Sequence, residues 1–159
     1  MSAKVITLPS NRGDARFVIE LGARSEYGDE RGFDSSVQLH GCHWNGDHTF
    51  AVSIEGLWLR AAELTPLRDH ISQWLQQPLD HLVAEDLSAE FQLTRLPGQS
   101  VHLRFGPRAD TISDRKPVVS IAYSAGALHG EFHFVTDQSC LAAFVEELSA
   151  AVNSFLKAT

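Results

Sequence analysis

The chain has 159 residues, of which 43% are hydrophobic and 21% are charged, and its formal net charge at pH 7 is −7. This profile is typical of one globular domain, so we expect a single α+β domain over residues 1–159. The acidic balance argues against a nucleic-acid partner, because affinity for phosphate comes from clustered Lys and Arg. No apolar run approaches the roughly 18 residues of a membrane span, and the N-terminal apolar run is too short for a signal peptide. We therefore expect a cytoplasmic protein without membrane contact.

The first sixty residues alternate between apolar and polar side chains with a period of two, which is typical of half-buried β-strands. Asn11 to Asp14 predicts a turn, and the polar, glycine-flanked stretch from Ser25 to Gly32 predicts a loop. The fourth strand is expected to be long or to bend near Gly56. The expected strands are Lys4 to Leu8, Phe17 to Leu21, Phe33 to His40 and Phe50 to Trp58.

A helix over about residues 65–77 follows these strands. Thr65 is a good N-cap, and Pro66 fits the first helical position, where its missing N–H has no intrahelical acceptor to lose. Pro78 ends the helix. The inward-facing stripe of this helix consists of Leu67, Ile71, Trp74 and Leu75.

Four further alternating segments predict a second group of strands, and the chain then closes with a helix over about residues 137–156. Gly126 marks the turn before the last strand, and Thr136 or Asp137 can cap the last helix. The expected strands are Phe91 to Thr94, Val101 to Phe105, Val118 to Tyr123 and Ala127 to Val135. The apolar stripe of the helix consists of Leu141, Phe144, Val145, Leu148, Val152, Phe155 and Leu156.

Short turns between consecutive alternating strands favour an antiparallel sheet with one solvated face. The expected fold class is α+β: a curved antiparallel β-meander with both amphipathic helices packed on its apolar face. The opposite face then carries the polar residues of the strands, and it is the candidate binding surface. Its members are Glu20, Gln38, His40, Ser53, Glu55, Gln92, Thr94, His102, Arg104, His129, Glu131 and His133. As binding residues we select Glu20, Gln38, Glu55, His102, Arg104, His129, Glu131 and His133.

Residues 129–133 read H-x-E-x-H along one face of a strand, which suggests a metal site. Because a strand rises about 3.3 Å per residue, His129 and His133 stand about 13 Å apart and cannot share one ion. A site would need Glu131 with one of these histidines and a ligand such as His102 from a neighbouring strand. A second group (His40, Cys42, His43 and His48) matches no zinc-module spacing. We therefore predict neither a metal nor a cofactor.

Recognisable catalytic constellations are missing from the sequence. It contains no G-x-G-x-x-G, no P-loop and no G-x-S-x-G. Cys140 falls in the first turn of the expected last helix, where the helix dipole favours a lowered thiol pKa. A buried, unreactive thiol is the favoured interpretation, because no partner base is visible. We therefore predict a non-enzymatic protein.

Three segments carry a resemblance to a known family. They are F-x-I-x-L at Phe17 to Leu21, L-x-x-L at Leu64 to Leu67, and G-x-L-x-G-x-F-x-F-x-T-D-Q-S-x-L at Gly126 to Leu141. Together they resemble the WapI-type bacterial immunity proteins and related small bacterial domains of unknown function. The resemblance implies a cytoplasmic protein that neutralises a toxin domain by binding it, and it supplies no catalytic residues.

The expected function is therefore a non-enzymatic binding protein with a toxin as its partner. The alternative is a metal- or small-ligand-binding domain that uses the polar His/Glu face of the sheet. A structural or oligomeric role is a third interpretation. Self-association through an edge strand or the back of a helix leaves monomer and homodimer both open.

Overall fold

The structure is a computed structural model, and it describes residues 4–10, 12–42, 49–76, 89–94, 98–107 and 117–157. The order of elements repeats, because four strands and a helix are followed by four more strands and a second helix. The first unit comprises β1 (Lys4–Pro9), β2 (Ala15–Tyr27), β3 (Glu30–Cys42), β4 (Thr49–Arg60) and α1 (Ala61–Gln76). The second comprises β5 (Ala89–Thr94), β6 (Gln99–Pro107), β7 (Pro117–Ala125), β8 (Leu128–Val135) and α2 (Gln138–Lys157).

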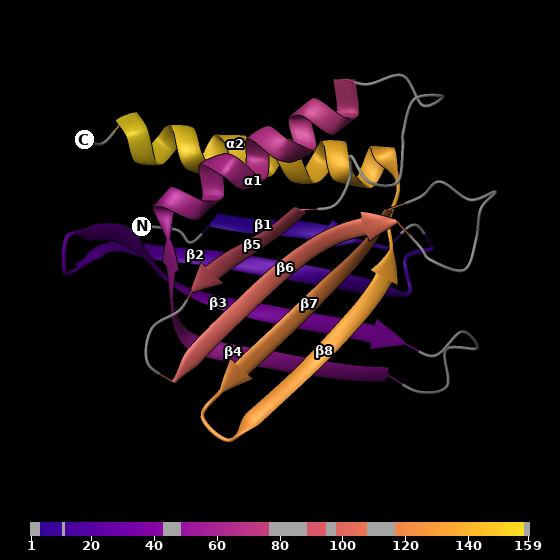
Figure 1. Cartoon of the computed structure of the whole chain (residues 1–159), viewed down its shortest axis with the longest axis horizontal. Coiled ribbons are helices and arrows are strands. Elements are labelled where there is room, and N and C mark those ends of the chain that lie inside the picture. The colour runs from indigo at the N-terminus through magenta and orange to yellow at the C-terminus, as the bar shows by residue number, and fades with distance from the viewer. Residues whose placement is uncertain are drawn as a thin grey trace.

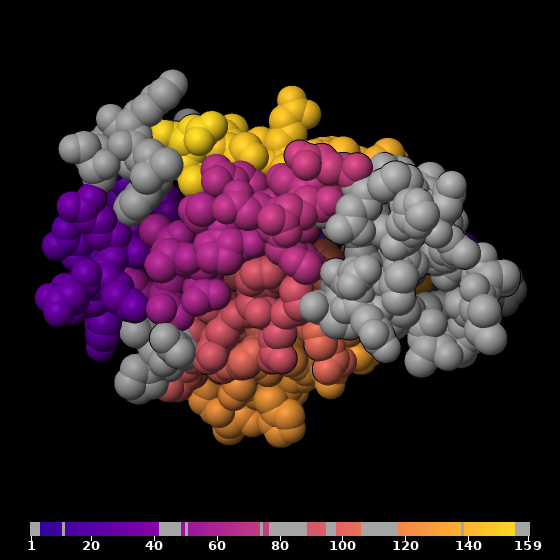
Figure 2. Space-filling view, turned by 45° about the horizontal axis from the view of Figure 1, so that its top comes forward, coloured from indigo at the N-terminus to yellow at the C-terminus, as the bar shows by residue number. Residues whose placement is uncertain are grey.

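Each group of four strands forms its own antiparallel meander, in the order β1-β2-β3-β4 and β5-β6-β7-β8. Figure 1 shows the second sheet lying obliquely across the first, with α1 and α2 together along the side formed by β1 and β5. Figure 2 shows the two helices against each other, with strands of the second sheet below them. The helices thus cover one open side of a two-sheet arrangement.

One continuous hydrophobic core joins both sheets and both helices. Phe17 and Ile19 come from the first sheet, Leu103 and Ile121 from the second, and all four are fully buried. The helices add the apolar stripes that the sequence predicts, and their described members pack into this core. They are Leu67, Ile71 and Leu75 on α1, and Leu141, Phe144, Val145, Leu148 and Val152 on α2.

The α+β class, the antiparallel meander order and the two amphipathic helices are confirmed. The strands divide between two sheets, so each apolar face meets the other sheet as well as the helices. Alternation along a strand shows that one face is buried, but it does not show what covers that face. Among the described residues, no helix is long and apolar enough to cross a membrane.

The start of α1 differs from the prediction. The helix begins at Ala61, directly after β4, and Pro66 lies inside it rather than at its first position. Pro66 therefore removes one intrahelical hydrogen bond, to the carbonyl of Ala62. The apolar stripe outweighs this loss, because Leu64, one turn before the predicted stripe, is also fully buried. Thr65 is consequently a helical residue and not the N-cap.

The second helix begins as predicted. The carboxylate of Asp137 accepts a hydrogen bond of 2.9 Å from the backbone N–H of Cys140, which is N-cap geometry. Thr136, the other candidate cap, is fully buried and donates its hydroxyl to the carbonyl of Pro9 at 3.0 Å. This hydrogen bond connects the residue before the α2 N-cap to the last residue of β1.

The prediction of a loop from Ser25 to Gly32 is wrong. β2 continues to Tyr27 and β3 begins at Glu30, so only two residues form the turn. The polar residues that suggested a loop lie instead on an exposed hairpin whose strands extend past the core (Figure 1). The predicted bend at Gly56 is confirmed as a β-bulge. Glu55 and Gly56 together oppose Ser36, and Gly56 has a φ of 69°, which glycine adopts at little cost.

Candidate protein-binding face

The outer face of the β5–β8 sheet carries most of the selected polar residues. Strand register places Arg104, Ser120 and His133 in one row across β6, β7 and β8. The next row runs from His102 through Ala122 to Glu131. Because neighbouring strands lie about 4.8 Å apart, side chains within a row are in reach of their direct neighbours. This set of residues, together with Glu90 of β5 and His129 of β8, is called the polar face below.

Four side chains of the polar face form a connected network across three strands. Glu131 Oε1 lies 3.4 Å from His133 Nε2 and 3.8 Å from Arg104 Nη2. On its other side, the His133 ring has Nδ1 at 2.8 Å from Ser120 Oγ. Arg104, Glu131 and His133 are each more than half exposed, so solvent screens these charges and each pair stabilises the fold only weakly. The network therefore leaves charges of both signs available to a partner.

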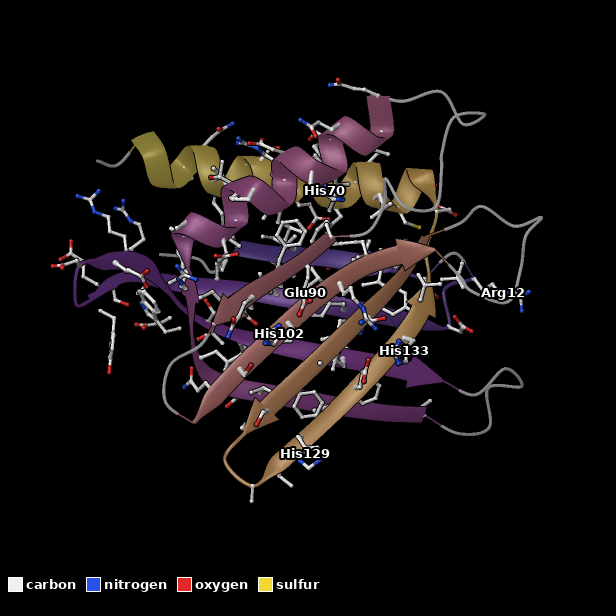
Figure 3. The ribbon with its side chains drawn as sticks, viewed as in Figure 1. Arg12, His70, Glu90, His102, His129 and His133 are labelled. Carbon is white, nitrogen blue, oxygen red and sulfur yellow. The ribbon has the colours of Figure 1, made fainter. Side chains whose placement is uncertain are left out.

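His102 belongs to a separate pair. Its Nδ1 lies 2.9 Å from Glu90 Oε1 on the neighbouring strand, and Figure 3 shows the two side chains together. β7 separates His102 from Glu131, so these two residues stand about 10 Å apart. The combination of His102 with Glu131 that a shared metal would require is thus not formed.

His129 and His133 lie toward opposite ends of β8 (Figure 3). The described residues bring together no group of three His, Cys, Asp or Glu side chains that could hold a metal ion. Of the second histidine group, His43 and His48 lie outside the described residues, as does the Cys42 side chain. His40 has its Nε2 3.1 Å from Gln38 Oε1.

Glu20, Gln38 and Glu55 lie on the other sheet, so the eight selected residues do not share one surface. Glu20 and Gln38 are partly buried on β2 and β3, and Glu55 is exposed at the bulge of β4. Around them the outer face of the β1–β4 sheet also presents apolar positions such as Val5, which is 50% exposed. The expectation of a single polar face is wrong, because the polar residues of eight strands belong to two sheets.

Ser120 and Glu90 were not among the residues predicted from the sequence. For Ser120, the position of the turn before β8 was a usable signal. A two-residue turn at Gly126 and Ala127 pairs residues whose numbers sum to 253, which places Ser120 opposite His133. Ser120, His133 and Glu131 are the residue types of a hydrolase triad, but their surroundings do not provide an oxyanion hole. Ser120 lies in mid-strand between two ladders, where backbone N–H groups bond to neighbouring strands and cannot bind an oxyanion.

A second feature without a sequence signal is a cavity of about 380 Å³ between the β2–β3 hairpin and the start of α1. In its wall, the nearly buried guanidinium of Arg60 pairs with Glu30 at 3.1 Å and with Glu63 at 3.0 Å. Phe33, Leu64 and Val152 contribute apolar lining. Both terminal nitrogens of Arg60 already have carboxylate partners, so the charge of this residue is neutralised within the fold.

Cys140 does not have the activated thiol that its position in the first turn of a helix suggested. Burial raises the pKa of the Cys140 thiol, and the hydrogen bond and negative charge of Asp137 raise it further. The helix dipole is thus outweighed by desolvation and by the capping carboxylate. The raised pKa agrees with the unreactive thiol that the sequence favoured, although Cys140 is only partly buried.

The comparisons with known proteins place the chain in no family. No family model matches the sequence, and no curated protein matches it. Among solved structures, the plant transcriptional regulator PBF-2 is similar, with a TM-score of 0.49 and 14% sequence identity. The similarity covers 98% of this chain and 88% of that chain. A likeness of this size leaves the function of this chain open.

Proposed function

We propose that this chain is a non-enzymatic binding protein that takes a protein partner on the polar face of the β5–β8 sheet. The observation that carries the proposal is the network of Arg104, Glu131 and His133, which is exposed on a sheet face that neither helix covers. Charged side chains on β6 and β8, with Ser120 of β7 between them, present a fixed pattern of donors and acceptors. Such a pattern gives specificity and orientation to a protein–protein contact.

The partner that fits this surface is a folded protein that presents charges of both signs. The sequence resemblance to immunity proteins gives this partner a more specific form, a bacterial toxin domain that is neutralised in the cytoplasm. A blocking protein of this kind needs no catalytic groups of its own. It needs a rigid surface, and a sheet anchored in the common core supplies one.

The test is a binding titration against the toxin domain encoded beside the gene for this chain. The face variant Arg104→Ala/Glu131→Ala removes one charge of each sign from the polar face. The matched control, Arg16→Ala/Glu20→Ala, removes one charge of each sign from the outer face of the other sheet. We expect the face variant to weaken binding by about tenfold or more, because interfacial charge pairs contribute on that scale. The control should bind like the unmodified chain.

Two results would contradict the proposal. If the neighbouring toxin domain does not bind the unmodified chain, the immunity function is wrong. If it binds and the control variant weakens binding while the face variant does not, the partner uses the β1–β4 sheet. Thermal unfolding of both variants, followed by circular dichroism, shows whether each retains the fold.

A further inference from the structure

The two sheets have four edge strands, and three of them carry features that hinder pairing with another strand. β1 ends in Pro9 and lies beside α2, where Glu147 accepts a hydrogen bond of 3.2 Å from the N–H of Thr7. β4 contains the Gly56 bulge. β5 has six residues and a register shift, and α1 packs beside it through His70. Bulges, prolines and covering helices are the usual protections of sheet edges.

Among the residues that the structure describes, β8 has none of these protections. Within the described part of the chain it pairs with β7 alone, over eight consecutive residues without a register shift. It contains no proline and no lysine, and its first residue, Leu128, is 73% exposed. Figure 1 shows it on the opposite side of the molecule from the helices. A regular edge that no described helix or strand covers can accept a further strand.

The turn before β8 determines which backbone groups face this edge. Gly126, with a φ of 62°, and Ala127 form a two-residue turn, so Ala125 and Leu128 are a hydrogen-bonded pair. Hydrogen-bonded and non-hydrogen-bonded pairs alternate along antiparallel strands. Phe132 therefore bonds to β7, whereas the N–H and C=O groups of Glu131 and His133 point outward.

β8 is complementary to a second, antiparallel copy of itself centred on Phe132. In that register the two Phe132 residues form the non-hydrogen-bonded pair at the twofold axis. Glu131 of each copy then faces His133 of the other, and the outward backbone groups of both residues meet. Phe134 faces Gly130, over which the Tyr123 ring already lies, since a Cβ there would come within 2.8 Å of it. An aromatic side chain opposite a strand glycine is a favourable cross-strand pair.

We propose that a second copy of this chain pairs with β8 in this register, forming a continuous eight-stranded sheet across the dimer. The polar faces of the two copies then lie side by side on one surface. This proposal goes beyond the proposed function, because it depends on the edge of the sheet and not on any toxin. It is also specific in register, so it can be tested by cross-linking.

The cross-linking experiment places one cysteine in β8 of the full chain, in a Cys42→Ser/Cys140→Ser background. Phe132→Cys puts two thiols at the twofold axis, where directly opposed Cβ atoms lie about 4.5–5.5 Å apart and a disulfide can form. Phe134→Cys is the matched control, because its two copies would stand about 13 Å apart. We expect oxidation to give a covalent dimer with Phe132→Cys and none with Phe134→Cys. Equal cross-linking of both variants, or of neither, would overturn the register.

A second experiment measures mass in solution by size-exclusion chromatography with light scattering. The unmodified chain should have twice the mass of one chain. Glu131→Pro removes an outward N–H without affecting the pairing with β7, and we expect it to weaken dimerisation by at least about tenfold. Glu131→Gln keeps that N–H and should dimerise more strongly than the proline variant. A monomeric unmodified chain, or a folded Glu131→Pro variant that dimerises normally, would refute the proposal whether or not the toxin binds.

Discussion

The two ββββα units share an order of elements but differ in the lengths of their strands, in their sheet edges and in their outer faces. The first has strands of 6, 13, 13 and 12 residues, and the second has strands of 6, 9, 9 and 8. The longer strands of the first unit extend past the core into the exposed β2–β3 hairpin. The edge strand of this unit, β4, contains a β-bulge. The second unit has a regular edge and a charged outer face. A common topology builds one core, and the edges and outer faces are free to take different functions.

The units also differ in how a strand passes into a helix. In the first, β4 leads directly into α1, and the Arg60 side chain at the junction pairs with Glu63 in the first turn. In the second, two residues separate β8 from α2, and Asp137 caps the helix. Arg60 offers no side-chain acceptor for the N–H groups of α1, whereas Asp137 does. Of the two helices, α2 is thus the one that begins with a side-chain N-cap.

The largest effect should come from a large side chain on each helix that is fully buried. Phe144→Ala on α2 should destabilise the fold by about 4 kcal/mol, and Leu67→Ala on α1 by about 3 kcal/mol, because each leaves a cavity. Both side chains are fully buried in the common core. Chemical denaturation monitored by near- and far-UV circular dichroism measures these losses. Because the core is shared, each variant should still unfold in a single transition, and two separate transitions would show that the units are independent.

Two glycines give the next comparison. A Cβ at Gly32 in the first unit would clash with the backbone oxygen of Leu59 and would lie 2.5 Å from the Trp58 ring. A Cβ at Gly130 in the second would meet the movable ring of Tyr123. We expect Gly32→Ala to cost about 3 kcal/mol, since a backbone atom must shift. Gly130→Ala should cost about 1 kcal/mol or less, and the reverse order in thermal unfolding would contradict this reasoning.

The helix caps give a smaller effect. Asp137→Ala should destabilise the protein by about 1 kcal/mol, because the N–H of Cys140 loses its acceptor. Asp69→Ala on α1 is the control, since the Asp69 carboxylate is exposed and pairs with the adjacent Arg68. The control should change the free energy of unfolding by less than about 0.5 kcal/mol. Equal losses for the two variants would mean that the contribution of the cap is negligible.

The sequence predicted the local structure better than it predicted the assembly. Alternation with a period of two gave all eight strands, and apolar spacings of three and four gave the inward faces of both helices, because burial of one face determines each pattern directly. The division into two sheets left no such trace, since an apolar strand face looks the same under a helix or under another sheet. The contact of Ser120 with His133 could be derived from the two-residue turn. The register of β6 against β7 could not, because a long connection separates those strands and leaves their offset free.

The smallest expected effect concerns the thiol beside the α2 cap. With its pKa raised by burial and then by Asp137, Cys140 should react with iodoacetamide more slowly than a free cysteine, and its rate should rise only at higher pH. Asp137→Asn keeps a good cap but removes the negative charge, so it should lower the thiol pKa and increase the rate by a few-fold. The measurement is alkylation against pH in a Cys42→Ser background. Because burial is the larger cause, the variant should still react more slowly than the unfolded chain, and equal rates would show that Asp137 alone protects the thiol.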